Sequence, residues 1–200
     1  MRKISLFMLF LVSSMALCLT SCLGDDDDDS LTQEQIQTAR QAMRGNYSGA
    51  THSYLASSSR KDSTFNTSWT LNDSTVTIYN FPVSQLALAL DTTTHKAEIA
   101  ALKKVPAQTV KCYWGFYQTS NFGNPNYYFG VAPATVTVNF EADGKSHQLK
   151  ASFQSLQSYM SVYSVTQHLM GLQFLTYQIQ LDNATISKQM LFVLGPSSKY

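Results

Sequence analysis

The chain has 200 residues, of which 44% are hydrophobic and 14% are charged, and its formal net charge at pH 7 is +1. This length fits one domain with a core of its own. The few charges form no basic cluster of the kind that binds nucleic acid, so we expect no nucleic-acid partner.

The N-terminal segment has the parts of a secretory signal. Arg2 and Lys3 give a positive start, and residues 4–19 are an apolar stretch too short for a stable membrane span. The Leu-Thr-Ser that precedes Cys22 resembles the lipobox of bacterial lipoproteins. The resemblance implies that residues 1–21 are a cleaved signal peptide and that acyl chains on Cys22 anchor the protein in a membrane. An ordinary signal with an incidental cysteine is the alternative.

Five aspartates, residues 25–29, follow Cys22 almost at once. They repel one another and keep the chain extended, so we predict that residues 22–30 are the lipidated cysteine and an acidic tether. The run also resembles the export signal of Bacteroidetes lipoproteins. That resemblance implies an outer-membrane location facing the cell exterior, and a linker without an address, on the periplasmic face, is the alternative.

Residues 31–200 remain as a single β-rich domain. They contain twelve basic side chains, the 14 of the chain less Arg2 and Lys3, and eight acidic ones, 13 less the five aspartates. Cys112 is the one cysteine of this stretch, so no intramolecular disulfide is expected.

The first element of the domain is a predicted amphipathic helix over residues 31–44. Ile36, Ala39 and Met43 recur at helical spacing. Thr32 is a candidate N-cap, with a glutamine three residues later as in a capping box. From Gly45 onward most segments alternate apolar and polar residues, as strands do.

Two hairpins are predicted with their registers. A two-residue turn at 72–73 would place Trp69 opposite Val76. A turn at 143–144 would place Phe140 opposite His147 and put one apolar and one polar face on the hairpin. Both pairings are self-consistent, so an antiparallel sheet is expected.

The remaining segments are shorter. Residues 175–181 alternate like a strand, with Leu175, Tyr177, Ile179 and Leu181 on one face, and residues 190–194 read as a last, buried strand. Residues 83–90 and 96–104 are expected to be short helices. Leu156–Met170 fits helix and strand about equally and stays open.

These elements predict a mainly β fold: an antiparallel barrel or sandwich, with a lipocalin-like barrel favoured, an N-terminal helix and one or two short helices. Gly45 and Tyr47 after the helix resemble the start of a lipocalin barrel. The lipobox, tether, helix, this strand start, Asn80-Phe81-Pro82 and the 143–147 hairpin together resemble a family of about 200-residue lipoproteins of gut Bacteroidetes. That family implies no activity.

Catalytic and metal-binding motifs are missing from the sequence. Cys112 falls on the apolar face of its strand, where a thiol is normally inert. The polar face of that strand takes Lys111, Tyr113 and Tyr117. The histidines, at 52, 95, 147 and 168, lack metal-ligand spacing. We expect His147 to lie at the edge of the sheet, partly exposed to solvent. We therefore expect no enzyme, metal or cofactor.

One loop stands out as a candidate binding site. Residues 121–129 mix turn formers with Phe122, Tyr127, Tyr128 and Phe129. Aromatic rings suit the recognition of sugars or protein surfaces. The alternative is that these rings tuck under an end of a barrel.

Four Asp-Ser/Thr sequences resemble the acceptor of O-glycosylation in Bacteroidetes. The candidate acceptors are Ser30, Ser63, Ser74 and Thr92.

Three functions follow from these features. The first is a non-catalytic binding or accessory module for a glycan or a protein partner. The second is a lipocalin-like carrier, which needs an apolar cavity that Trp69, Trp114 and Phe140 do not fill. The third is a hydrolase without a recognisable motif.

Overall fold

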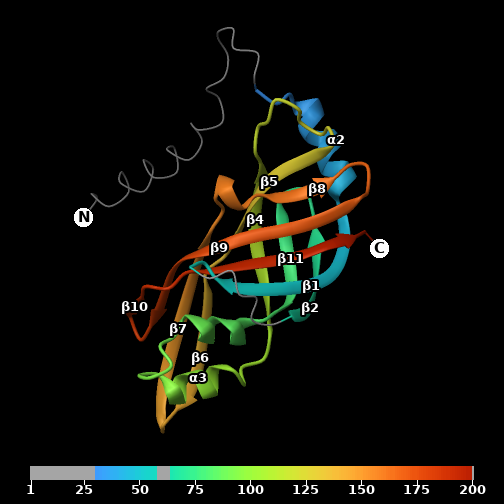
Figure 1. Ribbon diagram of the computed structural model, residues 1–200. Coiled ribbons are helices and arrows are strands. Elements are labelled where there is room, and N and C mark those ends of the chain that lie inside the picture. The colour runs from blue at the N-terminus through green and yellow to red at the C-terminus, as the bar shows by residue number, and fades with distance from the viewer. Residues whose placement is uncertain (1–29, 58–63, 200) are drawn as a thin grey trace, which may run out of the picture. The chain divides into compact units, whose positions relative to one another are not determined.

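The computed structural model describes residues 30–57 and 64–199, and residues 31–200 form one compact unit (Figure 1). Cys22 and Ser63 lie outside the described residues. In chain order the elements are α2 (Gln33–Met43), β1 (Gly45–Leu55), β2 (Thr64–Leu71), β3 (Thr75–Phe81), η1 (Val83–Ala89), α3 (Lys96–Leu102), β4 (Gln108–Phe116), β5 (Asn126–Pro133), β6 (Val136–Ala142), β7 (Lys145–Gln154), η2 (Gln157–Tyr159), β8 (Ser161–Ser164), β9 (Leu169–Leu181), β10 (Ala184–Ile186) and β11 (Met190–Ser198).

Eight strands close into an antiparallel barrel, which confirms the predicted fold class. Each strand pairs with the next in the order β1, β2, β3, β4, β5, β8, β9 and β11. Strand β11 then pairs with β1 and closes the barrel. This is the up-and-down connection of lipocalins. The β6–β7 hairpin is inserted between β5 and β8, and β10 between β9 and β11.

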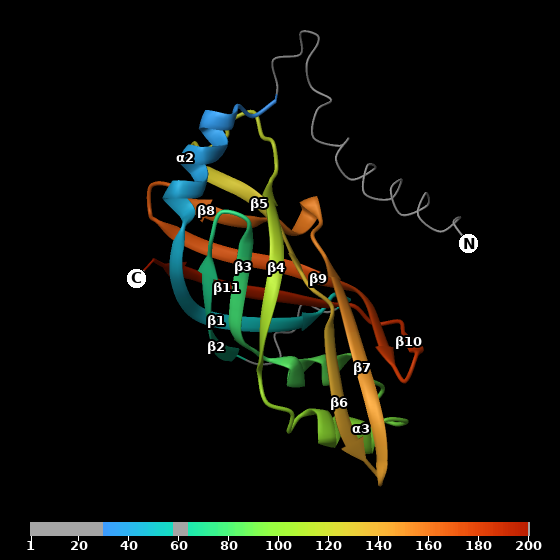
Figure 2. The same ribbon diagram turned by 180° about the vertical axis from the view of Figure 1, so that it is seen from behind.

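The insertions gather at one end of the barrel. Because the strands alternate in direction, successive connections fall at opposite ends. One end, here called the helix end, carries α2, the β2–β3 turn and the β4–β5 loop. The other, the hairpin end, carries η1, α3, β10 and the β6–β7 hairpin, as Figure 2 shows.

Helix α2 begins with the predicted capping box. The Gln35 amide donates to Thr32 Oγ1 at 3.2 Å, and the Thr32 amide donates to Gln35 Oε1 at 2.8 Å. Ala39 and Met43 are buried, and the Arg40 guanidinium lies over the Trp114 ring, 6.0 Å from its centroid. These contacts hold the helix on the barrel.

Aromatic rings fill the barrel interior. Phe81, Phe153, Phe174 and Phe192 each contact the other three, with ring centroids 4.9–6.2 Å apart. Closer to the helix end, Trp69 is fully buried and stacks on Tyr47. These described rings therefore pack the part of the interior that they line.

The hairpin end extends one side of the barrel as a small sheet. Strand β9, 13 residues long, pairs through its second half with β7 and β10, and β7 pairs with β6. The register predicted for β6 and β7 is confirmed: Phe140 lies opposite His147, and Val138 opposite Leu149.

The register predicted for the other hairpin is wrong by two residues. Trp69 lies opposite Ile78, not Val76, because the turn is centred on Asp73 and Ser74: the Asn72 amide donates to the Thr75 carbonyl at 2.9 Å. A shift of two residues keeps every side chain on its predicted face.

One further residue differs from its predicted place, and one open segment is assigned. Tyr177 was expected on the buried face of β9 but is 51% exposed, because the β7–β9 pairing shifts register between Ser152 and Phe153. The open segment 156–170 divides into η2, β8 and the start of β9. Within residues 30–57 and 64–199, no helix has the length and apolar character needed to cross a membrane.

Candidate binding site on the outer wall of the barrel

Strand β4 divides its side chains between the core and the outer wall. Val110 and Cys112 point inward and are buried, whereas Lys111 and Tyr113 point outward. Burial raises the pKa of the Cys112 thiol to about 12, so the thiol stays protonated and unreactive at neutral pH. Cys112 therefore belongs to the core, as its place in the sequence predicts.

The outer wall carries a shallow groove between two tyrosines. Gly115 of β4 lies opposite Gly130 of β5, and Tyr113 lies opposite Ala132. The floor therefore lacks large side chains, and Tyr113 and Tyr117 flank it. The cavity measures about 290 Å³ and is also lined by Ser155. We call it the tyrosine groove.

The two walls of the groove differ in rigidity. The Tyr117 and Ser155 hydroxyls are 2.6 Å apart and share a hydrogen bond. A Cβ added to Gly130 would collide with Ser155 Oγ and lie 2.9 Å from the Tyr117 hydroxyl, whereas one added to Gly115 would meet nothing within 4 Å. Tyr113 is 73% exposed. Tyr117 is thus a fixed wall, and Tyr113 is free to adapt to a ligand.

The groove offers flat apolar faces beside hydroxyl groups. Among the described residues that line it, none is charged, and Tyr113, Tyr117 and Ser155 supply side-chain hydroxyls that can donate or accept. Such a surface suits a ligand with both planar apolar faces and hydroxyls, as sugar rings have.

The loop residues predicted for binding are only partly accessible. Phe129 is fully buried in the core, and Tyr127 is 8% exposed. Phe122 is half-buried and packs on Tyr127, with centroids 4.9 Å apart. Phe129 therefore has the alternative, buried arrangement, whereas Phe122 and Tyr127 still line a cavity at the helix end of the barrel.

Tyr128 alone of the four points toward the wall that bears the groove. The Tyr117 amide donates to the Tyr128 carbonyl at 2.9 Å, so the two tyrosines are cross-strand neighbours. Sequence reasoning placed Tyr113 and Tyr117 on the polar face but did not select them as a site. The usable signal was a glycine between two tyrosines on a solvent-facing strand.

Three of the candidate glycosylation positions lie on the surface. Ser30, Ser74 and Thr92 are exposed. Their exposure makes them accessible to a modifying enzyme, whereas Ser63 lies outside the described residues.

His147 forms a specific pair at the hairpin end. Its Nδ1 lies 2.6 Å from Asp182 Oδ2, and its side chain, 12% exposed, stacks on Phe140. The hydrogen bond to Asp182 raises the pKa of His147, and Glu98 of α3 adds to this. The hydrogen bond from the Gln148 amide, and to a lesser extent the one from His147, lowers the pKa of Asp182. The described part of the chain gathers no three His, Cys, Asp or Glu residues fit to hold a metal ion.

The His147–Asp182 pair predicts a pH-dependent stability. Because the pKa of His147 is raised in the folded state, protonated His147 stabilises the fold below about pH 6.5. This stabilisation is lost as the pH rises through the folded-state pKa. Because the pKa of Asp182 is lowered in the folded state, ionised Asp182 stabilises the fold above about pH 4. This stabilisation is lost as the pH falls through the folded-state pKa. The pair should therefore contribute most at about pH 4–6.5, by under about 1 kcal/mol because Asp182 is 47% exposed.

The measurement is urea unfolding at pH 5 and pH 8.5. Asp182→Asn should flatten the difference between the two values, and it suits the positive φ of this position. Asp143→Asn, at another exposed positive-φ aspartate, should keep the wild-type difference. An unchanged difference in Asp182→Asn would refute this role of the pair.

The residues that line the tyrosine groove lie within the part of the chain that matches a known family. A family model described as a domain of unknown function (DUF4840) matches residues 42–181, from the end of α2 to the end of β9. No curated protein and no solved structure matches the chain.

Proposed function

Because this chain belongs to the DUF4840 family, whose function is unknown, we propose its role from its own geometry: a non-catalytic module that binds a glycan in the tyrosine groove. The observation that carries the proposal is Tyr113, 73% exposed beside a floor of Gly115 and Gly130. A large ring held in water beside a side-chain-free floor leaves room for a flat ligand to stack.

The groove lining favours binding over catalysis. Among the described residues that line it, none offers a carboxylate, imidazole or thiol that could move a proton or attack a substrate. A hydrolase would need such groups to converge at the site.

The packed interior makes the carrier function the weaker candidate. Trp69 is fully buried and the four phenylalanine rings near the hairpin end touch one another, whereas Phe140 belongs to the inserted β6–β7 hairpin. A carrier holds its ligand in an apolar cavity inside the barrel. The outer wall is therefore the better place for a ligand.

The proposal includes a location. Acyl chains on Cys22 would anchor the protein in the outer membrane, with the acidic tether of residues 25–29 directing it to the cell exterior. A glycan-binding wall on that side would meet polysaccharides or surface partners outside the cell. The support for this location comes from the sequence.

Filling the groove floor tests the function with little risk to the fold. Gly115→Val should abolish glycan binding and leave stability unchanged or higher, because the new Cβ meets nothing within 4 Å and valine favours strands. Tyr113→Ala should weaken binding roughly tenfold. The measurement is affinity electrophoresis of the full chain through starch, xylan, mannan and mucin glycans.

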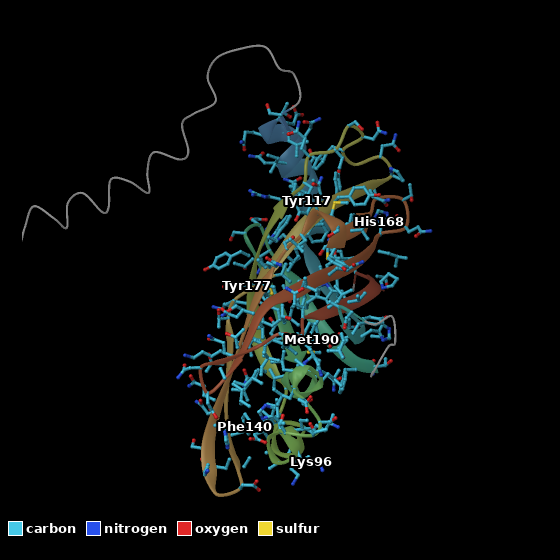
Figure 3. All side chains as sticks on the ribbon, turned by 60° about the vertical axis from the view of Figure 1, so that its left-hand side comes forward. Lys96, Tyr117, Phe140, His168, Tyr177 and Met190 are labelled. Carbon is cyan, nitrogen blue, oxygen red and sulfur yellow. The ribbon has the colours of Figure 1, made fainter. Side chains whose placement is uncertain are left out.

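The matched control is Tyr177→Ala. Its ring is 51% exposed but does not line the groove, and Figure 3 places it nearer the hairpin end than Tyr117. This variant should bind like the wild type. Absence of retardation by every polysaccharide, or equal retardation of wild type and Gly115→Val, would overturn the proposal.

A further inference from the structure

A second cavity lies at the helix end, separate from the tyrosine groove. It measures about 230 Å³ and is lined on one side by Glu34, Gln35 and Thr38 of α2 and on the other by Phe122 and Tyr127. It shares no lining residue with the groove. We call it the mouth pocket.

The aromatic side of the mouth pocket is a corner of two rings. The Phe122 and Tyr127 centroids are 4.9 Å apart, and their planes are tilted by 52°. Phe116 backs both rings, at 5.2 Å from Phe122 and 6.0 Å from Tyr127. The corner is therefore set by packing within the fold.

The helical side supplies a negative charge. Among the described residues that line the pocket, Glu34 is the one with a charge, and within the described part of the chain its carboxylate forms no ion pair. Arg40, two turns along α2, is placed over the Trp114 ring. No described cation of the lining competes for the Glu34 carboxylate.

The capping box pairs two of the four free amides at the start of α2. The Thr32 and Gln35 amides are both paired within the capping box. The lining thus combines a carboxylate with two aromatic rings, and carboxylates and aromatic rings both attract positive charge.

We infer that the mouth pocket binds a small organic cation bearing an ammonium group. The cation would lie in the Phe122–Tyr127 corner, with the Glu34 carboxylate balancing its charge. The site is independent of glycan binding, because groove and pocket are lined by different residues.

The test is a ligand-observed NMR titration of the full chain with tetramethylammonium and with choline. The uncharged probe 3,3-dimethyl-1-butanol has the shape of choline without its charge. Choline should bind with an affinity about tenfold higher than the alcohol, because only choline has the charge that the rings and Glu34 attract.

Two variants separate charge from shape. Glu34→Gln should weaken choline binding roughly three- to tenfold and leave the capping box in place, because Glu34 is not one of its members. Phe122→Leu should have a similar effect while keeping apolar packing against Phe116. Glu141→Gln, an exposed glutamate of β6, is the matched control and should bind like the wild type.

The outcomes decide the inference without reference to the groove. Binding of choline that falls in both variants, but not in Glu141→Gln or Gly115→Val, would support it. Equal binding of choline and the alcohol, an unchanged affinity in Glu34→Gln, or no binding of either cation would overturn it.

Discussion

Replacing Phe174 with alanine is expected to lower the free energy of unfolding by about 3–5 kcal/mol. Phe174 is fully buried and its ring contacts Phe81, Phe153 and Phe192. These rings come from β3, β7 and β11, so the lost contacts join distant parts of the chain. The surrounding rings are held by one another and cannot collapse into the space that alanine leaves.

The measurement is equilibrium unfolding in urea. Tyr177→Ala, three residues along the same strand, removes an aromatic ring that is half in water and should cost about 1 kcal/mol or less. Similar losses in the two variants would show that the phenylalanine cluster is not the packed centre described above.

Replacing Cys22 with serine is expected to release the protein from the membrane. Each buried methylene contributes about 0.8 kcal/mol, so a residue that carries several acyl chains is held almost permanently, and its loss removes that whole contribution. Metabolic labelling with a clickable fatty acid, followed by membrane fractionation, measures the effect. Cys18→Ser, within the apolar stretch of the signal, is the control and should remain labelled and membrane-bound.

The aspartate run tests the direction of export separately. With residues 25–29 changed to alanine, the protein should still carry the fatty acid but lose labelling by a membrane-impermeant reagent on intact cells. Unchanged surface labelling would show that the aspartate run is only a spacer. Absence of fatty acid from the wild-type protein would refute the lipid anchor itself.

The two hairpins show how far the sequence determines register. Asp143 and Gly144 both have positive φ, as a two-residue turn that matches strand twist requires, so one pairing is strongly preferred. Around residues 72–75, Asn, Asp, Ser and Thr all tolerate turns, and alternation of period two looks the same after a two-residue shift. The faces could therefore be predicted there, but the partners could not.

The tyrosine groove depends on neighbours that are distant in sequence. Alternation along β4 placed Tyr113 and Tyr117 in solvent, but the floor exists only because Gly130 of β5 comes to lie opposite Gly115. That pairing depends on the length and path of the intervening loop, which has no repeating pattern. Ser155, the partner of Tyr117, arrives after a whole inserted hairpin.

Exposure of Tyr177 could not be predicted for a similar reason. A register shift between β7 and β9 moves one residue of the strand out of alternation. Its cause lies in how two strands pair, and the local sequence of residues 175–181 contains no glycine or proline to mark it.

Closure of the barrel by β1 and β11 constrains when the protein can fold. The Ser48 amide donates to Ser197 Oγ at 3.1 Å, a contact between residues 149 positions apart. Until β11 has been synthesised, β1 and β9 remain open edges, and pairing across such a separation is slow. The barrel therefore reaches its final closed state only once nearly the whole domain has been made.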